Sequence, residues 1–368
     1  MEPILKEVQD AGLGQSLLRE VIRLADRFKE KYGHPPAYME VCGSHTHALA
    51  RTGIKRALKD HVRFISGPGC PVCVTDQKTI DAMIALTEGE NRIICTFGDM
   101  LRIPGSKGSL LKAKTEGKDI RVVYSPSDSV RIAKENPDNE VIFLGVGFET
   151  TIPVLGIALK EAWEDGVKNF SMWVTTKLVE PVVRYLLHSG EAKLDGFLLP
   201  GHVSVVLGKN QYGYLVDEYG IPGVISGFEM NEMLSSIYLL IELGLKEEAK
   251  IINNYKSVVK DEGNPQALAI METFFTPNDE AWRGIGVIPK SGLDIREEYC
   301  SLNAKIRFPV TVGEPIKTKC RCGEIIRGLV GPEDCPLFGK ACTPMKPIGP
   351  CMVSLEGSCS AHYKYLRE

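Results

Sequence analysis

The sequence lacks any long run of apolar residues and any strong excess of charge of either sign. A membrane-spanning helix needs about 20 consecutive apolar residues, and no segment of the 368 residues approaches that length. The formal net charge is −3, so nothing calls for a nucleic-acid or anionic-membrane partner. The first residues are polar rather than apolar, so no targeting segment is expected. We therefore expect a cytoplasmic protein that binds neither nucleic acid nor membrane.

Cysteine is absent between Cys95 and Cys300, although the chain has 11 cysteines in total. The first hundred residues contain four of them, and the last seventy contain the other seven. In a reducing compartment, such clusters indicate metal or redox chemistry more often than structural disulfides. The distribution predicts two sulfur sites separated by a cysteine-free middle.

Eight short β-branched runs, each followed by a motif or a helix-length segment, predict an α/β fold with parallel sheets. Two series of four have a similar layout, which predicts two similar parallel-sheet α/β domains plus a small Cys-rich iron–sulfur domain. The runs are 37–41, 62–66, 92–96 and 120–124, then 141–146, 172–176, 196–199 and 223–226.

The expected domain boundaries follow changes in composition. Residues 1–36 contain an amphipathic helix, which we expect to pack on the C-terminal unit. Residues 37–138 and 139–260 form the two α/β domains, separated at the polar segment 135–139. Residues 261–368 form the Cys-rich domain.

The segment Gly67-Pro-Gly-Cys-Pro-Val-Cys73 follows an expected strand and precedes a helical pattern. Glycine and proline force a tight turn there. A strand-to-helix turn offers free amide groups and the positive end of the helix dipole, which favour a thiolate. We interpret Cys70 and Cys73 as a redox or metal-handling dithiol, with half a zinc site or two buried thiols as the alternative.

The first strand ends in Cys42-Gly-Ser-His-Thr-His47. Open α/β sheets bind their ligands at the carboxyl ends of the strands. Cys42 and His45 are therefore candidates for a nucleophile–base pair or for two metal ligands. The alternative is that Cys42 only packs. Asp99, after the third strand, falls on the same edge, and its alternative role is to cap a helix.

Polar residues also follow strands of the second series, namely Glu149, His202 and Glu229. Gly145-Val-Gly147 lacks the third glycine of a dinucleotide loop, and Glu149 would repel a pyrophosphate, so no nucleotide site is predicted. We expect these side chains to face a cleft shared with the cysteines of the first domain. A structural role for His202 is an open alternative.

The tail carries six cysteines at wide, irregular spacings, whereas structural zinc sites use paired Cys-x2–4-Cys knuckles. Such spacing suits a [4Fe–4S] cluster held by thiolates from loops. The predicted ligands are Cys320, Cys335, Cys342 and Cys359. Cys322 and Cys351 then remain for one dithiol or disulfide beside the cluster.

Together these motifs resemble the HypD family of [NiFe]-hydrogenase maturation factors. The resemblance spans essentially the whole chain. It rests on Cys42–His47, Gly67–Cys73, Gly147–Thr151, Pro200–Ser204 and the six-cysteine tail. It implies two similar α/β units plus a [4Fe–4S] unit, with a cluster and dithiol like those of ferredoxin:thioredoxin reductase. It also implies a scaffold that builds the Fe(CN)2CO group with a HypC-type chaperone and a HypE-type cyanide donor.

The resemblance suggests roles for the candidate residues. Cys42 would anchor the low-spin iron of the transient Fe(CN)2CO group, because cyanide- and CO-bound iron suits soft thiolate ligands. A cluster would supply electrons singly and the Cys322/Cys351 pair would store two.

The other roles stay open. Cys70 and Cys73 would close a disulfide, receive electrons or touch the iron. His45, Glu149 and His202 would be acid–base groups or would orient a metal ligand. The rival functions are an iron–sulfur thiol–disulfide oxidoreductase that acts on a protein disulfide, and a binding module built on structural zinc.

Overall fold

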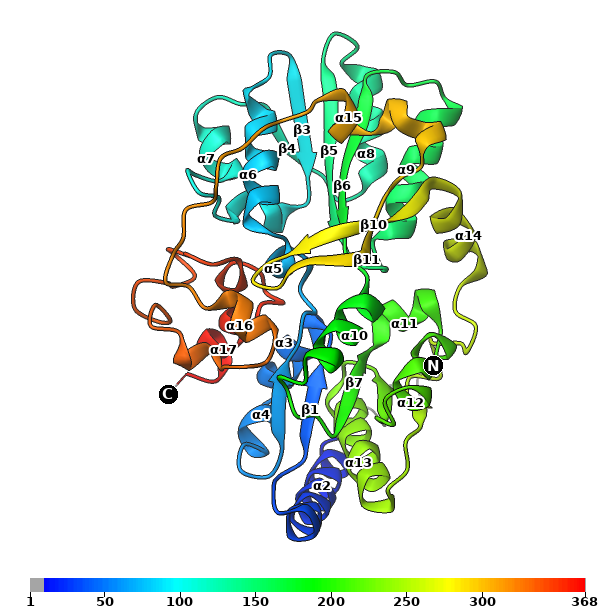
Figure 1. Cartoon of the computed structure of the whole chain (residues 1–368), viewed down its shortest axis with the longest axis vertical. Coiled ribbons are helices and arrows are strands. Elements are labelled where there is room, and N and C mark those ends of the chain that lie inside the picture. Colours follow the sequence, from blue (N-terminus) through cyan, green and yellow to red (C-terminus); the bar gives the residue numbers. More distant parts are fainter. Residues whose placement is uncertain (1–9, 368) are drawn as a thin grey trace.

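The structure is a computed structural model that describes residues 10–367. It contains two parallel sheets, one antiparallel hairpin and a C-terminal segment of short helices and loops (Figure 1). This arrangement confirms the predicted α/β class with parallel sheets and a Cys-rich region. In the described part of the chain, no helix is both long and apolar enough to span a membrane.

The first sheet has five strands in the order β2-β1-β7-β8-β9. Alternate residues of β1 face opposite sides, as the two-residue period of a strand requires. Met39 packs in a core that continues to the second sheet. Tyr38 packs on the other side with helices α2 (Ala11–Tyr32), α3 (Gly43–Arg51) and α13 (Met230–Lys246). The strands are β1 (Ala37–Glu40), β2 (Arg63–Ser66), β7 (Gly196–Pro200), β8 (Gly223–Ser226) and β9 (Ile251–Asn253).

The second sheet has four strands in the order β4-β3-β5-β6. Helices α6 and α7 cover one face, and α8 and α9 cover the other. Its central strand β5 is almost entirely buried, as expected for a parallel strand covered on both faces. The strands are β3 (Arg92–Thr96), β4 (Ile120–Val122), β5 (Glu140–Gly147) and β6 (Phe170–Thr176).

Short and amphipathic helices connect these strands. They are α2 (Ala11–Tyr32), α3 (Gly43–Arg51), α4 (Ile54–Ala57), α5 (Pro71–Val74), α6 (Gln77–Ala85), η1 (Leu86–Glu88), η2 (Gly98–Arg102), α7 (Leu110–Thr115), α8 (Pro126–Glu135), α9 (Ile152–Glu164), α10 (Val179–Ser189), α11 (Gly201–Leu207), η3 (Asn210–Tyr212), α12 (Gly213–Asp217) and α13 (Met230–Lys246).

The strands do not divide between the sheets in the way the sequence suggested. The expected domains 37–138 and 139–260 each contribute strands to both sheets, because β1 pairs with β2 and β7 whereas β3 and β4 join β5 and β6. The Val41 amide donates to the Leu198 carbonyl, which continues the β1–β7 ladder. The spacing of strands along the sequence does not specify which strands pair, because the packing of the buried strands in the folded protein decides this.

The N-terminal helix packs on the first sheet's helix α13, and not on the C-terminal unit as expected. Val21, Leu24 and Phe28 share one core with apolar residues of α13. The Tyr32 hydroxyl donates to the Gly244 carbonyl at 2.8 Å, and the Lys31 ammonium donates to the Leu245 carbonyl at 3.0 Å. Amphipathicity predicted that this helix packs against a partner surface, but it did not identify the surface.

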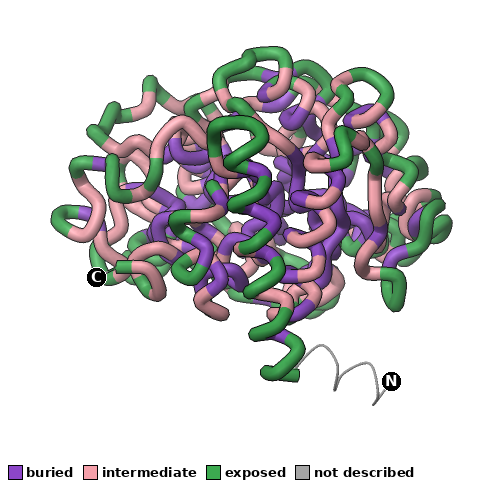
Figure 2. The backbone as a smooth tube through the Cα atoms, turned by 90° about the horizontal axis from the view of Figure 1, so that it is seen from below, coloured by how far each residue is buried: buried purple, intermediate pink, exposed green. Residues whose placement is uncertain are grey.

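After β9, helix α14 (Pro265–Phe274) leads into the hairpin of β10 (Phe275–Trp282) and β11 (Gly286–Ile295). The hairpin crosses the middle of the molecule, and an extended segment 308–319, here called the strap, then runs past α6 to the C-terminal unit (Figure 1). Buried residues occupy the centre of the molecule (Figure 2). The last elements are η4 (Glu297–Leu302), α15 (Ala304–Arg307), α16 (Cys322–Ile326), η5 (Pro332–Asp334), η6 (Pro350–Met352) and α17 (Ser358–Tyr365).

Candidate functional site

A cavity of about 280 Å³ lies where the carboxyl ends of strands from both sheets meet. Each contributing strand places the residue after its end in the wall, because side chains there leave the ladder and project past the sheet edge. Cys42 and Ser44 follow β1, Asp99 follows β3, Phe148 follows β5 and His202 follows β7.

Cys42 is the N-cap residue of α3, and the backbone amides of His45 and Ser44 there act to lower the pKa of its thiol. Burial nevertheless dominates and raises the pKa of Cys42 to about 12. The side chain is therefore a neutral thiol at pH 7. A soft metal ion that binds there must displace the thiol proton.

The turn before α5 packs directly on Cys42. The Gly43 amide donates to the Gly69 carbonyl at 3.0 Å, and the Gly67 amide donates to the Glu40 carbonyl at 2.9 Å. Cys70 and Cys73 form a disulfide with their Cα atoms 5.2 Å apart. Pro71 and Val72, between the two cysteines, line the cavity. The structure thus selects the disulfide among the states that the sequence left open.

His45 and His202 lie on opposite faces of one phenyl ring. The Phe228 ring centroid is 4.6 Å from that of His45 and 4.1 Å from that of His202. The His45 Nε2 atom donates to the carbonyls of Ser226 and Gly227, at 3.2 and 3.0 Å. Burial lowers the pKa of His45 to about 4.

His45 is accordingly a fixed, neutral imidazole at pH 7. Its Nδ1 atom is buried and has no hydrogen-bond partner among residues 10–367. A neutral imidazole whose Nε2 donates presents Nδ1 as an acceptor. His45 can therefore accept a hydrogen bond at neutral pH, but it cannot act as a general acid. His202 as a whole is exposed, but the part of its side chain that is buried loses contact with water, and this lowers its pKa.

Glu149 lies behind the cavity wall, between the lining residues Phe148 and Thr150. Its Oε1 atom accepts the Val179 amide at 2.8 Å, and its buried Oε2 atom has no partner in the described chain. Burial raises the pKa of Glu149 to about 7. A carboxyl group with a pKa near the ambient pH is suited to proton transfer.

Two residues near Cys42 carried no signal in the sequence. The buried Tyr212 hydroxyl accepts a hydrogen bond from the Ser204 hydroxyl at 3.1 Å, and burial raises the pKa of Tyr212. Glu356, in the C-terminal unit, accepts the Ser44 hydroxyl at 2.8 Å. The C-terminal unit therefore closes one side of the cavity, through a contact between residues more than 300 positions apart.

Five tail cysteines line one small cavity in the C-terminal unit, together with Phe338, Gly349 and Met352. The sixth, Cys351, hydrogen-bonds to Cys322, and Cys322 hydrogen-bonds to Cys320. The Ile348 amide donates to the Cys342 sulfur at 3.2 Å. The cavity-lining cysteines are Cys320, Cys322, Cys335, Cys342 and Cys359.

This donor set fits an iron–sulfur cluster, because such clusters take thiolate ligands and amide hydrogen bonds to sulfur. Gly349 leaves room for the sulfurs, since a Cβ there would lie 2.6 Å from the Cys320 sulfur. Within residues 10–367, no three His, Cys, Asp or Glu side chains are arranged to hold a single metal ion.

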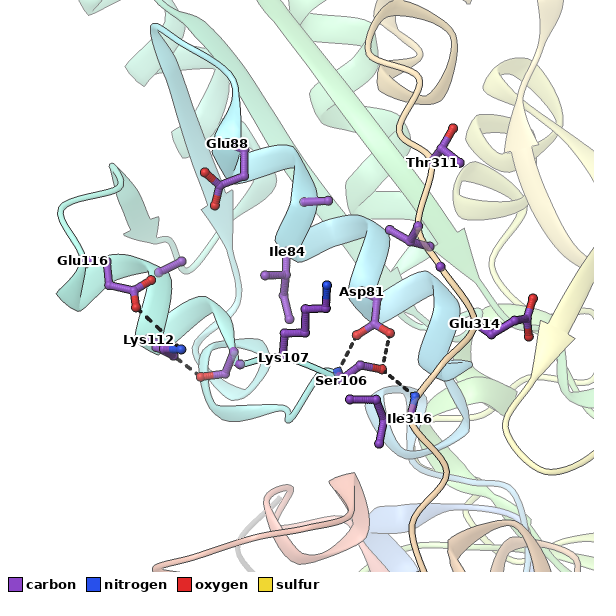
Figure 3. A pocket seen from close by; sticks show the side chains of 16 residues that line it. Asp81, Ile84, Glu88, Ser106, Lys107, Lys112, Glu116, Thr311, Glu314 and Ile316 are labelled. Carbon is purple, nitrogen blue, oxygen red and sulfur yellow. Dashed lines mark hydrogen bonds and ion pairs between the residues drawn. The ribbon is translucent and has the colours of Figure 1, made fainter.

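A larger cavity, of about 490 Å³, lies elsewhere and contains none of the predicted site residues. The strap crosses it, with the Ile316 amide donating to the Ser106 hydroxyl at 3.1 Å (Figure 3). Asp81 accepts both the amide and the hydroxyl of Ser106. These contacts fix the strap against α6 just before Cys320.

The chain was compared with known proteins. The family model HypD, described as "Hydrogenase formation hypA family", matches residues 16–366. Hydrogenase maturation factor HypD of Rhodobacter capsulatus is 41% identical over 366 residues, covering 98% of this chain and 97% of the relative. HypD of Escherichia coli K12 is 39% identical over 358 residues, covering 95% and 96%. Hydrogenase expression/formation protein HupD of Azotobacter chroococcum is 40% identical over 370 residues, covering 98% and 96%. The resemblance read from the motifs is confirmed, and this chain belongs to the HypD family of hydrogenase maturation factors.

Proposed function

We propose that this chain is a redox-active scaffold on which the Fe(CN)2CO group of [NiFe] hydrogenases is assembled. A HypC-type chaperone would share the iron, and a HypE-type partner would deliver cyanide. The observation that carries the proposal is the position of Cys42. Its thiol lines a cavity at the meeting edges of two sheets, beside the turn that holds the Cys70–Cys73 disulfide.

Cys42 would bind the iron, which is the cargo of the scaffold. Low-spin iron with cyanide and CO ligands prefers soft sulfur donors to oxygen donors. The Ser44 and His45 amides, which already act to lower the pKa of Cys42, would stabilise the thiolate once the metal replaces its proton. Glu149, with a pKa of about 7, would exchange protons near the site during ligand attachment.

The electrons for assembly of the Fe(CN)2CO group would come from the cysteine-rich tail. A [4Fe–4S] cluster held by Cys320, Cys335, Cys342 and Cys359 would supply them singly when bound. Oxidation of the Cys322 and Cys351 thiols to a disulfide releases two electrons and two protons. Reduction of the Cys70–Cys73 disulfide to two thiols consumes two electrons and two protons, so the two reactions balance. A low-potential one-electron donor protein would then restore the Cys322/Cys351 pair.

Infrared spectroscopy of the complex with a HypC-type partner, purified without oxygen, tests the proposal. Metal-bound cyanide and CO absorb where protein does not. Cys42→Ser should abolish these bands, because a serine hydroxyl is far less acidic and a harder ligand than a thiol. Cys300→Ser is the matched control, since Cys300 is an exposed free thiol outside both sulfur sites. Normal bands in Cys42→Ser would refute the anchor role.

A second candidate is an iron–sulfur thiol–disulfide oxidoreductase that acts on a protein disulfide. It is favoured by the Cys70–Cys73 disulfide, because α5 packs against the two helices that carry Cys322 and Cys351. Turnover of a protein disulfide by the isolated chain, without iron cargo or a HypC-type partner, would support this candidate over the scaffold.

A further inference from the structure

Strand β2 forms one edge of the first sheet, with β1 on its inner side. The Arg63 amide donates inward, to the Pro36 carbonyl at 2.9 Å. Because alternate residues of a strand turn their backbone groups to opposite sides, Phe64 and Ser66 turn theirs outward, away from β1. In the described part of the chain, these outward amides and carbonyls have no hydrogen-bond partner. The outer side of β2 therefore offers donors and acceptors to a further strand.

A groove of about 450 Å³ lies along this outer side. One wall is β2 with the turn after α4, and the other is the loop 328–332 with part of α17. The loop is pressed against the strand, since a Cβ on Gly328 would lie 2.3 Å from the Ile65 Cγ2 atom. The C-terminal unit thus builds the second wall of a groove whose first wall is a free sheet edge.

Unpaired positive charge lies in this groove. Lys59 and Arg63 are exposed lining residues, and neither forms an ion pair with any residue that the structure describes. Lys55, beside them, is already paired with Glu40. Asp334, the carboxylate in the wall, accepts a backbone amide of its own turn at 2.7 Å. The groove therefore favours a ligand that carries negative charge.

The pleat of the sheet decides which sequence fits. Successive side chains of an added strand point alternately to the two faces of the sheet. On one face lies Lys55, whose ammonium is 3.4 Å from the Ser66 hydroxyl. On the other face lie Leu329 and Val330, in the loop that packs on Ile65. A strand with acidic residues towards the first face and apolar residues towards the second matches both.

We propose that this groove is a docking site for an extended acidic segment of a partner protein, which adds a strand to β2. The proposal goes beyond the scaffold function and does not rest on it. Strand addition supplies affinity through backbone hydrogen bonds and specificity through alternate side chains. A second copy of this chain is a poorer occupant, because pairing β2 with itself would bring the unpaired Lys59 and Arg63 of both copies together.

The position of β2 gives the docking site a use. The strand ends at Ser66 and leads directly into the turn that carries the Cys70–Cys73 disulfide. A segment bound along β2 would therefore tether its protein beside that turn. Such a tether raises the local concentration of the partner without requiring that the segment itself enter the cavity.

The test is fluorescence anisotropy with the purified full chain and a labelled peptide of alternating glutamate and valine. A peptide with lysine in place of glutamate is the matched probe. The glutamate peptide should bind saturably and about tenfold more tightly than the lysine peptide, because the lysine peptide meets like charges in the groove. Added salt should weaken the binding of the glutamate peptide, since the contacts are exposed to solvent.

Ser66→Pro removes the outward amide and should raise the Kd of the glutamate peptide about tenfold, through the lost hydrogen bond and the bulk of the ring. An edge strand tolerates proline where its N–H faces outward. Ser66→Ala is the matched control, because it loses the same hydroxyl and keeps the amide. It should bind like the unmodified chain.

Lys59→Glu is a second variant, in case Ser66→Pro fails to fold. It replaces an attraction by a repulsion and should raise the Kd about fivefold. Lys256→Glu is its control, because Lys256 is an exposed lysine without an ion pair in the described chain and follows β9, at the opposite edge of the same sheet. It should leave the Kd unchanged.

Absence of saturable binding, or equal binding of the two peptides, overturns the proposal. So does an equal loss in Ser66→Pro and Ser66→Ala, or in Lys59→Glu and Lys256→Glu. If light scattering finds a dimer of the free chain that Ser66→Pro dissociates, the groove is an interface between copies and the partner segment is refuted. The assay contains neither iron nor a HypC-type partner, so its failure is distinguishable from failure of the scaffold proposal.

Discussion

Gly69 lies so close to Cys42 that a Cβ at residue 69 would stand 2.5 Å from the Cys42 nitrogen. Real Cβ atoms do not approach backbone that closely, so only glycine fits here. The contact holds the turn before the disulfide against the end of β1. The position of the Cys42 thiol therefore depends on a residue that has no side chain.

Gly69→Ala should push the turn away from Cys42 and destabilise the fold by about 1–3 kcal/mol, as overpacking of a filled site does. Thermal unfolding measures the loss, and alkylation of Cys42 should become faster. Gly98→Ala is the control, at another glycine that follows a strand, because the nearest atom to its Cβ would be 3.6 Å away. Equal stability of the two variants would contradict the close contact.

Cys70→Ser and Cys73→Ser should behave alike in the infrared assay if the two thiols act as one redox pair. Either change removes the disulfide that the structure contains. Both variants should retain the iron–sulfur absorbance, because the tail has its own ligands. If only one of them loses the cyanide and CO bands, that residue contacts iron or cyanide instead.

Alanine at any of the four predicted cluster ligands should remove the brown iron–sulfur absorbance and lower the thermal stability of the C-terminal unit, because metal binding there also contributes folding energy. Cys322→Ala and Cys351→Ala should keep the cluster. Iron and sulfide analysis of anaerobically purified protein measures this. Loss of iron in Cys322→Ala with retention in Cys320→Ala would reverse the ligand assignment. The four predicted ligands are Cys320, Cys335, Cys342 and Cys359, all of which line the small cavity of the C-terminal unit.

Glu149 should make the protein less stable as the pH rises. Burial raises its pKa from 4.5 to about 7, so the folded state retains a proton that the unfolded state releases between these values. The stabilisation that the protonated Glu149 contributes is therefore complete below pH 4.5 and is lost as the pH rises to about 7. The difference between the two pKa values corresponds to a loss of about 3 kcal/mol in the free energy of unfolding.

Glu149→Gln keeps the acceptor for the Val179 amide but cannot ionise. Relative to the unmodified chain, its thermal midpoint should be similar at pH 5 and clearly higher at pH 8. Glu164→Gln, on the exposed face of α9, controls for the loss of a carboxylate. If the difference in thermal midpoint between Glu149→Gln and the unmodified chain is the same at pH 5 and pH 8, Glu149 is already ionised in the folded protein at pH 5.

Lys177 and Glu280 form a buried ion pair at 2.9 Å that ties the hairpin to the second sheet. Lys177→Met should cost about 3–5 kcal/mol, because it leaves a buried carboxylate without its cation. The double variant Lys177→Met/Glu280→Gln should recover part of that loss. Denaturant unfolding of both variants measures the recovery. A double variant less stable than Lys177→Met would show that the pair does not act as a unit.

Much of the site was present in the sequence. Strand runs followed by glycine, proline and polar residues placed Cys42, Asp99 and His202 at strand ends. Cys42 and His202 share one sheet as expected, but Asp99 follows a strand of the other sheet and reaches the cavity because the two sheets meet there. The cysteine-rich tail predicted a [4Fe–4S] cluster held by four cysteines, and all four of these residues line one small cavity together with Cys322. These inferences succeeded because they depend on local geometry and on residue chemistry.

Tertiary structure decided the rest. The sequence did not show that β1 joins β7, that α2 packs on α13, or that Glu356 meets Ser44, because many apolar and polar surfaces satisfy the same local pattern. Burial also outweighs local geometry at Cys42, because it raises the pKa of this thiol more than the backbone amides at the start of α3 lower it. The hairpin, α5 and the tail meet between the two groups of cysteines only because these distant segments fold against one another.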